Sequence, residues 1–349
     1  MSTHIREPQR ARAGAPRQPQ PPGGKPRHWA RWLATTLLLV SGVLTLGYTG
    51  VSTYIATKLV YEAPKAVVGT PSQYGLKFAY VTFPAREDGV RLKGWFIPGV
   101  LSYGRLTADR TLIMVHGTRT NRADVDAGLL KLSAALARQG FAVLAFDMRG
   151  MGQSPPAPLS MGYFEQRDVL GAVDFLRGGT LPYSELGRPR VIGGWGVSLG
   201  GASLIFAAAK ESAIRAVVSD CAYADIVPIF EREIPERGGL PALFTPGALV
   251  AAQALYGVNF YAVRPVDVIG NIAPRPILLI HGTADDYIPP SNMEQLYRAG
   301  SAPPNAHITQ WLVPGAKHAQ SFNTLGDQYV TRVVAFYTAA LGPDQSAAR

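Results

Sequence analysis

The chain has 349 residues, of which 47% are hydrophobic and 17% are charged, and its formal net charge is +10. This length suits one large domain with an appendage rather than two domains, because strand and helix patterns alternate from Leu76 onward without an internal linker. The charge is no evidence for a nucleic-acid partner, since residues 1–31 alone carry a net charge of +6. The single cysteine, Cys221, leaves the redox compartment open.

The first 28 residues form a basic, proline-rich segment. They contain six prolines and almost no apolar side chains, a composition typical of disordered chains. Seven basic residues up to Arg31 stand against one acidic residue, Glu7. Anionic lipid headgroups are the simplest partner for such a segment, at about 1 kcal/mol per basic residue near the surface. Residues 1–28 are therefore predicted to be a disordered tail that contacts membrane lipids.

An apolar run follows this tail. Trp32–Thr57 contains 26 residues without a charge, which at about 1.5 Å per residue is enough to cross a hydrocarbon layer about 30 Å thick. The run exceeds the ~7–15 residues of a signal peptide and lacks a clean small-x-small cleavage site, so we favour an uncleaved anchor over a cleaved signal. Residues 29–60 are predicted to span a membrane once. The basic flank keeps the N-terminus cytoplasmic and places residues 61–349 on the extracytoplasmic side.

An alternation of short apolar runs and helical patterns begins at Leu76. Eight strands are predicted, near residues 76–83, 91–97, 111–115, 141–146, 191–195, 214–219, 277–280 and 308–313. The first two are expected to be antiparallel, joined through the turn Glu87-Asp88-Gly89. Helices are predicted near residues 124–138, 163–176, 199–210, 291–298 and 327–340. This order predicts an α/β fold with a mainly parallel sheet and helices on both faces.

Gly196-Val197-Ser198-Leu199-Gly200 joins the fifth strand to the helix that follows it. A serine between two glycines at such a place is typical of the strained turn that exposes a nucleophilic hydroxyl. The pattern alone is weak, and a helix N-cap is the alternative role for a serine here. The strand before it and the helix after it favour Ser198 as the nucleophile of a hydrolase.

Residues 223–273 interrupt the alternation between the sixth and seventh strands. Prolines and glycines divide this insertion into short apolar helical pieces such as Ala248–Tyr256. An insertion at this place lies over the strand ends where Ser198 is exposed, so it can form a lid and part of an acyl pocket. Its apolar side chains bind a lipophilic acyl group in one interpretation, and in the other they only pack the lid onto the domain.

His318 is the histidine that lies in a loop just after a strand. Pro314 and Gly315 end that strand and leave the imidazole on a turn that can reach Ser198 as a general base. The hydroxyl needs this neighbour, because serine is a poor nucleophile until an imidazole takes its proton. His116 and His281 each end an apolar run and are predicted to support loops rather than to react.

A carboxylate between Ser198 and His318 in the chain would complete a catalytic triad. Asp285 and Asp286 follow the seventh strand, and Asp220 ends the sixth. The carboxylate would fix the tautomer of His318 and stabilise the imidazolium that forms during the reaction. This chemistry requires no metal and no organic cofactor.

These motifs together resemble the α/β-hydrolase superfamily over roughly Leu76–Gly342. His281-Gly282-x-x-Asp285-x-x-Ile288-Pro289 resembles the acid turn of the family, which places the acid at Asp285 rather than Asp286 and leaves Asp220 as a lesser alternative. Asp147–Ser154 resembles the glycine-rich loop after the fourth strand. Met114-Val115-His116-Gly117-Thr118 resembles the third strand and its loop, so the resemblance implies that Thr118 and Leu199 N–H form the oxyanion hole.

The resemblance implies a membrane-anchored serine hydrolase similar to esterases and lipases of this superfamily. We predict cleavage of a carboxylic ester or thioester, a small acyl ester or a lipid, through an acyl-enzyme on Ser198. A serine aminopeptidase-like peptide hydrolase is the alternative; it needs an acidic group for a peptide amine, for which Asp88, Glu165 and Glu231 compete. A non-catalytic scaffold on the same fold is a third possibility. The oligomeric state is left open.

Overall fold

The computed structural model describes residues 1, 3, 14 and 28–346, so nearly all of the predicted tail over residues 1–28 lies outside the described residues. The chain divides into two units, residues 1–47 and residues 48–349. The helical part of the first unit belongs to α1, which runs from His28 to Val60. By length and composition α1 is a candidate membrane span, with a mean hydropathy of 1.5 over its 18-residue window. The predicted boundary between an anchor over residues 29–60 and a catalytic domain over residues 61–349 stays a prediction.

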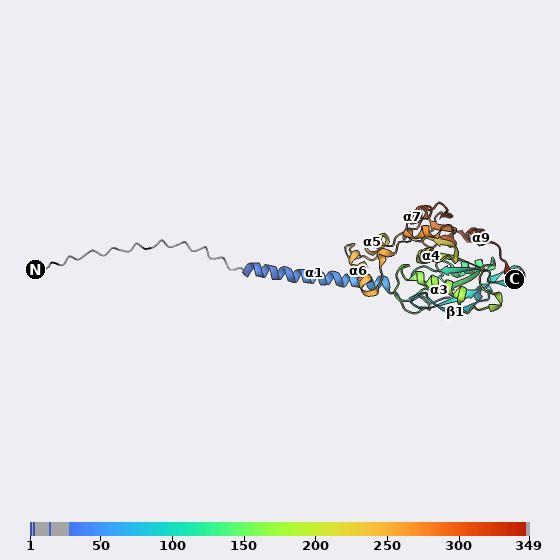
Figure 1. Cartoon of the computed structure of the whole chain (residues 1–349), viewed down its shortest axis with the longest axis horizontal. Coiled ribbons are helices and arrows are strands. Elements are labelled where there is room, and N and C mark those ends of the chain that lie inside the picture. Colours follow the sequence, from blue (N-terminus) through green and yellow to red (C-terminus); the bar gives the residue numbers. More distant parts are fainter. Residues whose placement is uncertain (2, 4–13, 15–27, 347–349) are drawn as a thin grey trace. The chain divides into compact units, whose positions relative to one another are not determined.

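The second unit is built on an eight-stranded sheet with the order β1-β2-β6-β5-β7-β8-β9-β10 (Figure 1). The strands β1 and β2 are antiparallel, β2 is antiparallel to β6, and every other neighbouring pair is parallel. The predicted mainly parallel sheet is therefore confirmed. The strand bounds are β1 Ala79–Pro84, β2 Arg91–Ile97, β5 Arg110–Val115, β6 Ala142–Phe146, β7 Val191–Val197, β8 Ile214–Asp220, β9 Ile277–Gly282 and β10 Ile308–Val313, while β3 Gly99–Val100 and β4 Leu106–Thr107 form a separate two-stranded hairpin.

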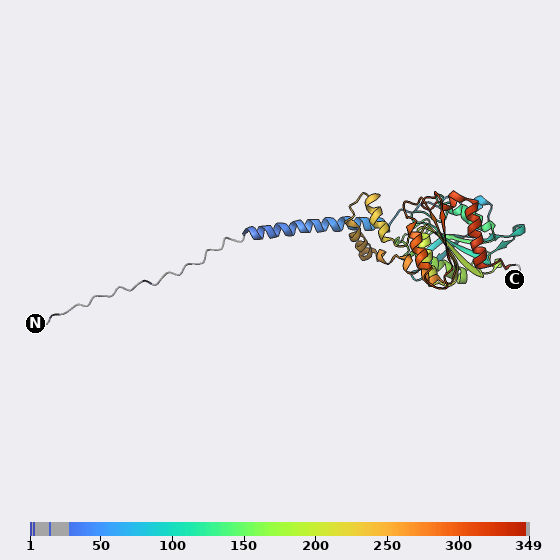
Figure 2. The same cartoon turned by 90° about the horizontal axis from the view of Figure 1, so that it is seen from above.

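Helices cover both faces of this sheet (Figures 1 and 2). Alternate residues of β5 belong to different apolar clusters: Ile113 and Val115 to one, Leu112 and Met114 to the other. Since neighbouring side chains of a strand point to opposite faces, each cluster lies on its own face. The first cluster includes residues of three helices: α3 Glu165–Gly178, α4 Leu199–Lys210 and α7 Ser291–Gly300. The second includes residues of α2 Leu129–Arg138, α8 Ser321–Leu325 and α9 Asp327–Leu341.

The predicted lid region, residues 223–273, contains two α-helices, α5 Val227–Glu236 and α6 Phe244–Tyr256. Short 3₁₀ helices complete this region and the connections elsewhere: η1 Pro71–Tyr74, η2 Ser102–Gly104, η3 Ser184–Leu186, η4 Phe260–Ala262, η5 Pro265–Asp267 and η6 Ile269–Ile272. Helix α6 carries no charge and most of its residues are apolar. It includes Ala248–Tyr256, the segment that the sequence predicts to be an apolar helix.

The last part of α1, residues 48–60, packs against α6. The ring of Tyr48 stacks on that of Phe244 with centroids 5.5 Å apart, and its hydroxyl donates to the carbonyl oxygen of Leu243 over 3.1 Å. The hydroxyls of Thr57 and Tyr256 are hydrogen-bonded at 2.7 Å. Ile55, Ala56 and Val60 are buried in the first apolar cluster, so this segment is part of the second unit rather than a free linker.

Helix α2 begins at Leu129, five residues later than predicted. The carboxylate of Asp124 accepts a hydrogen bond from the N–H of Ala127, and Gly128 has a φ of +69°, so a turn replaces the first helical residues. Helix α8 and the hairpin of β3 and β4 were not predicted, because elements this short leave no periodic pattern.

Candidate active site

Ser198 lies at the turn between β7 and α4. Its φ of +55° and ψ of −121° are rare for a residue with a side chain, and its N–H donates to the carbonyl oxygen of Asp220 over 2.8 Å. A side chain at Gly196 would overlap the carbonyl of Gly200, and one at Gly200 would overlap the carbonyl of Val115. The two glycines are thus required by close backbone packing, and together they hold the serine at the carboxyl end of the sheet.

The structure brings Ser198, His318 and Asp285 together. The distance between His318 Nε2 and Ser198 Oγ is 3.0 Å, and that between His318 Nδ1 and Asp285 Oδ2 is 2.8 Å. Because an ionised carboxylate only accepts hydrogen bonds, Nδ1 of His318 carries the proton and Nε2 is left to accept the serine hydroxyl. This arrangement has the geometry of a nucleophile, a base and an orienting acid.

The carboxylate of Asp285 is buried and fully hydrogen-bonded. Oδ1 accepts from the N–H groups of Tyr287 at 3.0 Å and Ile288 at 2.8 Å, while Oδ2 lies 2.8 Å from His318 Nδ1 and 3.3 Å from His281 Nε2. Burial by itself raises the pKa of Asp285, but the hydrogen bonds from His281 and His318 outweigh it and hold the pKa at about 2. Asp285 is therefore ionised at neutral pH and can stabilise an imidazolium.

The other two carboxylates considered for this place have different partners. Asp220 is buried and accepts from Ser321 Oγ and Tyr329 OH, each at 2.9 Å, and burial raises its pKa. The Asp286 side chain is 83% exposed and lies 3.8 Å from the Arg237 guanidinium. Of the three, Asp285 is the one that hydrogen-bonds to the His318 ring.

The two predicted oxyanion donors lie next to Ser198. Leu199 opens α4, and the first N–H groups of a helix have no acceptor within it. Thr118 lines the same cleft as Ser198, and a Cβ at the preceding Gly117 would lie 3.6 Å from that of Ser198. His116 steadies this loop, because its Nδ1 is 2.7 Å from the Gly117 carbonyl oxygen. The role of Thr118 and Leu199 as donors stays a prediction.

The glycine-rich loop, residues 147–154, is fixed in place by buried ion pairs. The Asp147 carboxylate pairs with Arg122, and Arg149 pairs with Asp168 at 2.6 Å. Asp88, one of the three acids considered for binding a peptide amine, is used here too, 2.8 Å from Arg149.

The other two acids considered for a peptide amine also lie elsewhere. Glu165 is buried, with Ser160 Oγ donating to it over 2.6 Å, and Glu231 is exposed on α5. Among the described residues, neither these two nor Asp88 lines the cleft of Ser198.

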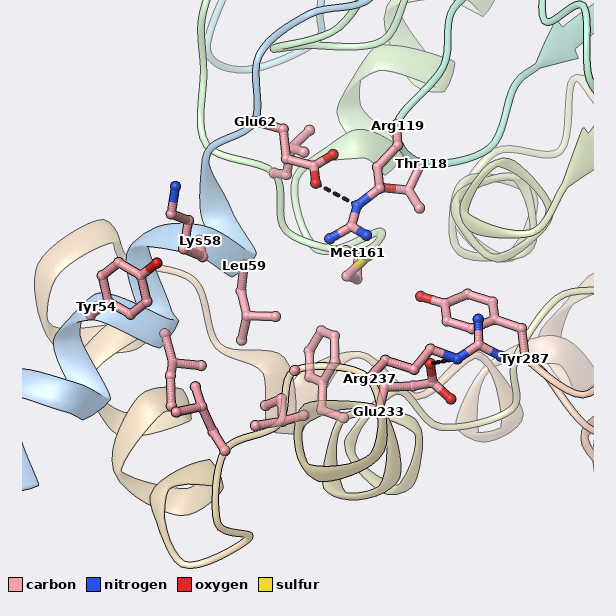
Figure 3. Close-up of a pocket in the computed structure, with 16 residues that line it drawn as sticks. Tyr54, Lys58, Leu59, Glu62, Thr118, Arg119, Met161, Glu233, Arg237 and Tyr287 are labelled. Carbon is pink, nitrogen blue, oxygen red and sulfur yellow. Dashed lines mark ion pairs between the residues drawn. The ribbon is translucent and has the colours of Figure 1, made fainter.

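A cleft of about 460 Å³ contains Ser198 and His318, and a cavity of about 370 Å³ shares lining residues with it. Figure 3 shows the residues that line the cavity. Four residues line both spaces: Thr118, Arg119, Arg237 and Tyr287. The edge of the Tyr287 ring also contacts the His318 ring, with centroids 5.0 Å apart. Sequence reasoning missed Arg119, Arg237 and Tyr287 as site residues, because no local motif marks them.

One group of possible metal ligands occurs among the described residues. Cys221, Asp285 and His318 place a ligand atom each within 4.8 Å of one another. A metal here would break the hydrogen bond between Asp285 and His318. Burial also raises the pKa of the Cys221 thiol well above its usual value, which disfavours the thiolate that binds metals. The group is better explained by packing of the thiol behind the triad.

Comparisons with known proteins point to one family. The family model for the alpha/beta hydrolase fold matches residues 110–244. The uncharacterized protein YfhR of Escherichia coli (strain K12) is 30% identical over 266 residues, covering 75% of this chain and 81% of that protein. Thiohydrolase aneE of Aspergillus aculeatus is 27% identical over 256 residues, covering 65% and 74%. The structure of the esterase Pf2001 of Pyrococcus furiosus superposes with a TM-score of 0.64 at 23% identity, covering 80% of this chain and all of that one.

Proposed function

The chain belongs to the α/β-hydrolase family, and from that premise we propose that it is a membrane-anchored serine hydrolase that cleaves carboxylic esters or thioesters. The observation that carries this proposal is the continuous contact from Ser198 through His318 to Asp285. The strained backbone at Ser198 supports it, because strain of this kind gathers at functional sites. The similarity to Pf2001, an esterase, and to aneE, a thiohydrolase, agrees with ester and thioester chemistry.

The mechanism follows from the positions of the three side chains. Ser198 Oγ attacks the acyl carbonyl carbon while His318 Nε2 takes the hydroxyl proton, and the charge on the imidazolium is balanced by Asp285. The N–H groups of Thr118 and Leu199 stabilise the oxyanion. His318 then gives its proton to the departing alcohol or thiol, leaving an acyl-serine. A water molecule then attacks the acyl-serine while His318 takes its proton. The bond between the acyl carbon and Ser198 Oγ breaks, and His318 returns the proton to Ser198 as the carboxylic acid leaves.

Two other functions receive less support. Peptide hydrolysis of the aminopeptidase kind needs an acid for the substrate amine, and none of the three acids considered for that role, Asp88, Glu165 and Glu231, lines the cleft of Ser198, although Asp126 and Asp286 do. A non-catalytic scaffold gives no reason for the strained Ser198 or for a buried Asp285 hydrogen-bonded to the His318 ring.

We further propose that α1 is the anchor, with the basic tail cytoplasmic and the catalytic unit extracytoplasmic. The apolar composition of α1 and the positive residues before it support this topology. The partners are then membrane lipids and an acyl-ester or lipid substrate. Cysteine labelling of intact cells at exposed Tyr103→Cys would place the catalytic unit on one side of the membrane.

Turnover by the full chain in detergent micelles tests the chemistry. Wild type is expected to hydrolyse p-nitrophenyl butyrate and a butyryl thioester, and to leave aminoacyl p-nitroanilides uncleaved. Faster cleavage of the anilides would favour the peptidase instead. Ser198→Ala serves as the blank for both substrates.

A further inference from the structure

The cavity beside the catalytic cleft has the last turns of α1 as one of its walls. Tyr54, Ile55 and Leu59 of α1 line it together with Phe230 and Ile234 of α5. Figure 3 labels Tyr54 and Leu59 on this side of the cavity. Its volume of about 370 Å³ falls in the range of roughly 300–1,000 Å³ that is usual for small-molecule sites. These five side chains are mainly hydrocarbon, so this part of the cavity fits an apolar ligand.

The cavity is also lined by five charged residues, Lys58, Glu62, Arg119, Glu233 and Arg237, of which Lys58 lies on α1. Arg119 pairs with Glu62, and Arg237 pairs with Glu233 at 2.8 Å. Both arginines also line the cleft of Ser198. A molecule with a hydrocarbon chain in the apolar part therefore has its polar end directed toward the serine.

The surface of α6 beside α1 is uncharged and apolar. The 26 residues from Gly238 to Val263 contain no charged side chain. Leu243, Val250 and Leu255 are each more than half exposed, and α6 contacts α1 through Tyr48 and Thr57. An exposed apolar face next to a candidate span fits the interface of a lipid bilayer better than water.

We propose that α1 is part of the substrate site: the cavity binds the acyl chain of a membrane lipid, which passes from the bilayer along Tyr54–Leu59 to Ser198. This inference rests on the proposed ester hydrolysis. The predicted span, Trp32–Thr57, itself includes Tyr54 and Ile55, so the proposed anchor and this wall of the cavity belong to one helix.

The energetics favour an entrance from the lipid. A chain that leaves the bilayer through water exposes its methylene groups to water, which is unfavourable for each of them. A chain that moves along α1 into the cavity exchanges one apolar environment for another and avoids this barrier. The anchor would then select substrate as well as hold the enzyme at the membrane.

Filling the cavity from α1 tests this proposal. Leu59 is half-buried and lines the cavity, while Thr53 is half-buried on the same helix and does not line it. The full chain is reconstituted in phosphatidylcholine vesicles and given monopalmitoylglycerol or p-nitrophenyl butyrate. For Leu59→Trp, the ratio of kcat/KM for the palmitoyl ester to that for the butyrate should fall at least tenfold, and for Thr53→Trp it should stay within twofold of wild type. An unchanged ratio in a folded Leu59→Trp protein, or the same fall in Thr53→Trp, overturns the proposal.

Photo-crosslinking tests the site independently of turnover and of the packing of a new tryptophan. Ser198→Ala in the same vesicles is irradiated with a monoacylglycerol that carries a diazirine at the end of its chain, and the adducts are mapped by mass spectrometry. Adducts at residues 54–59 and 230–240 support the proposal. Adducts confined to residues 32–47, or none above a chain-free diazirine control, overturn it. Absence of turnover in wild type would instead contradict the proposed hydrolysis, and the crosslinks would still decide whether the cavity takes an acyl chain.

Discussion

The cleft of Ser198 and the cavity beside it are held together by different kinds of contact. In the cleft, the groups of the triad have fixed partners, and the Asp285 carboxylate accepts from two backbone N–H groups and from the His318 ring. The cavity is lined mainly by apolar side chains from segments as distant in the chain as Tyr54 and Ile234, with half-exposed ion pairs at its rim. Loss of one group in the cleft should therefore stop the chemistry, whereas changes in the cavity should shift substrate preference by degrees.

The largest expected effect is that of Ser198→Ala. It removes the attacking oxygen and should lower kcat for butyrate esters by about 10³-fold or more, since the remaining groups cannot form the acyl-enzyme. The melting temperature should stay close to that of wild type, because the turn is held by backbone contacts. Retained turnover in the folded variant would show that Ser198 is not the nucleophile.

Asp285→Asn should have the next largest effect. The amide no longer balances the imidazolium, and a loss of about 10²–10⁴-fold in kcat is expected. Asp286→Asn is the matched control, because its side chain is exposed and should leave kcat within twofold. If the ranking of the two variants is reversed in ester assays, the acid lies one position further along the chain.

Gly200→Ala tests how tightly the cleft is packed. The new methyl group would overlap the backbone of Val115, and the free energy of unfolding should fall by about 1–3 kcal/mol. Gly178→Ala is the control, since no atom lies within 4 Å of the added Cβ. Urea unfolding of both variants gives the comparison; equal stabilities would show that the turn can relax.

The pKa of Asp285 gives a smaller, pH-dependent effect. Its folded pKa of about 2 is below the usual value of 3.8, so ionised Asp285 stabilises the fold above pH 4, and this stabilisation is lost as the pH falls toward 2. Between pH 5 and pH 3, wild type should lose about 1 kcal/mol more of its unfolding free energy than Asp285→Asn. Parallel pH profiles of the two proteins would contradict the assigned hydrogen bonds.

The smallest effect is expected at the rim of the cavity. Arg119 is 64% exposed, so solvent screens its pair with Glu62, and Glu62→Gln should change kcat/KM by no more than a few-fold. If Glu62→Gln lowered kcat/KM as much as Asp285→Asn does, the pair of Arg119 and Glu62 would take part in catalysis. The cleft and the cavity would then not differ in the way described.

The sequence predicts the cleft well because its determinants are local. Glycines flank Ser198, Pro314 and Gly315 end the strand before His318, and such residues act on the backbone within a few positions. The alternation of strands and helices predicts the sheet for the same reason. The start of α2 was misplaced, because the turn made by Asp124 competes with the helix.

The cavity could not be predicted in this way. Its walls come from α1 and α5, whose lining residues Leu59 and Phe230 are more than 170 positions apart in the sequence. No spacing rule relates residues so far apart. The uncharged run over residues 238–263 is visible in the sequence, but its packing against Tyr48 depends on tertiary structure. Arg119 and Tyr287 likewise gain a role only when the loops meet.

Labelling with a fluorophosphonate probe tests the central claim most directly. The purified full chain, wild type beside Ser198→Ala, is treated with the probe, and the modified peptide is identified by mass spectrometry. We predict labelling at Ser198 alone in wild type and none in the variant, because only an activated hydroxyl reacts. Absence of labelling in the folded wild-type protein, or labelling that persists in Ser198→Ala, would contradict the assignment of Ser198 as the nucleophile.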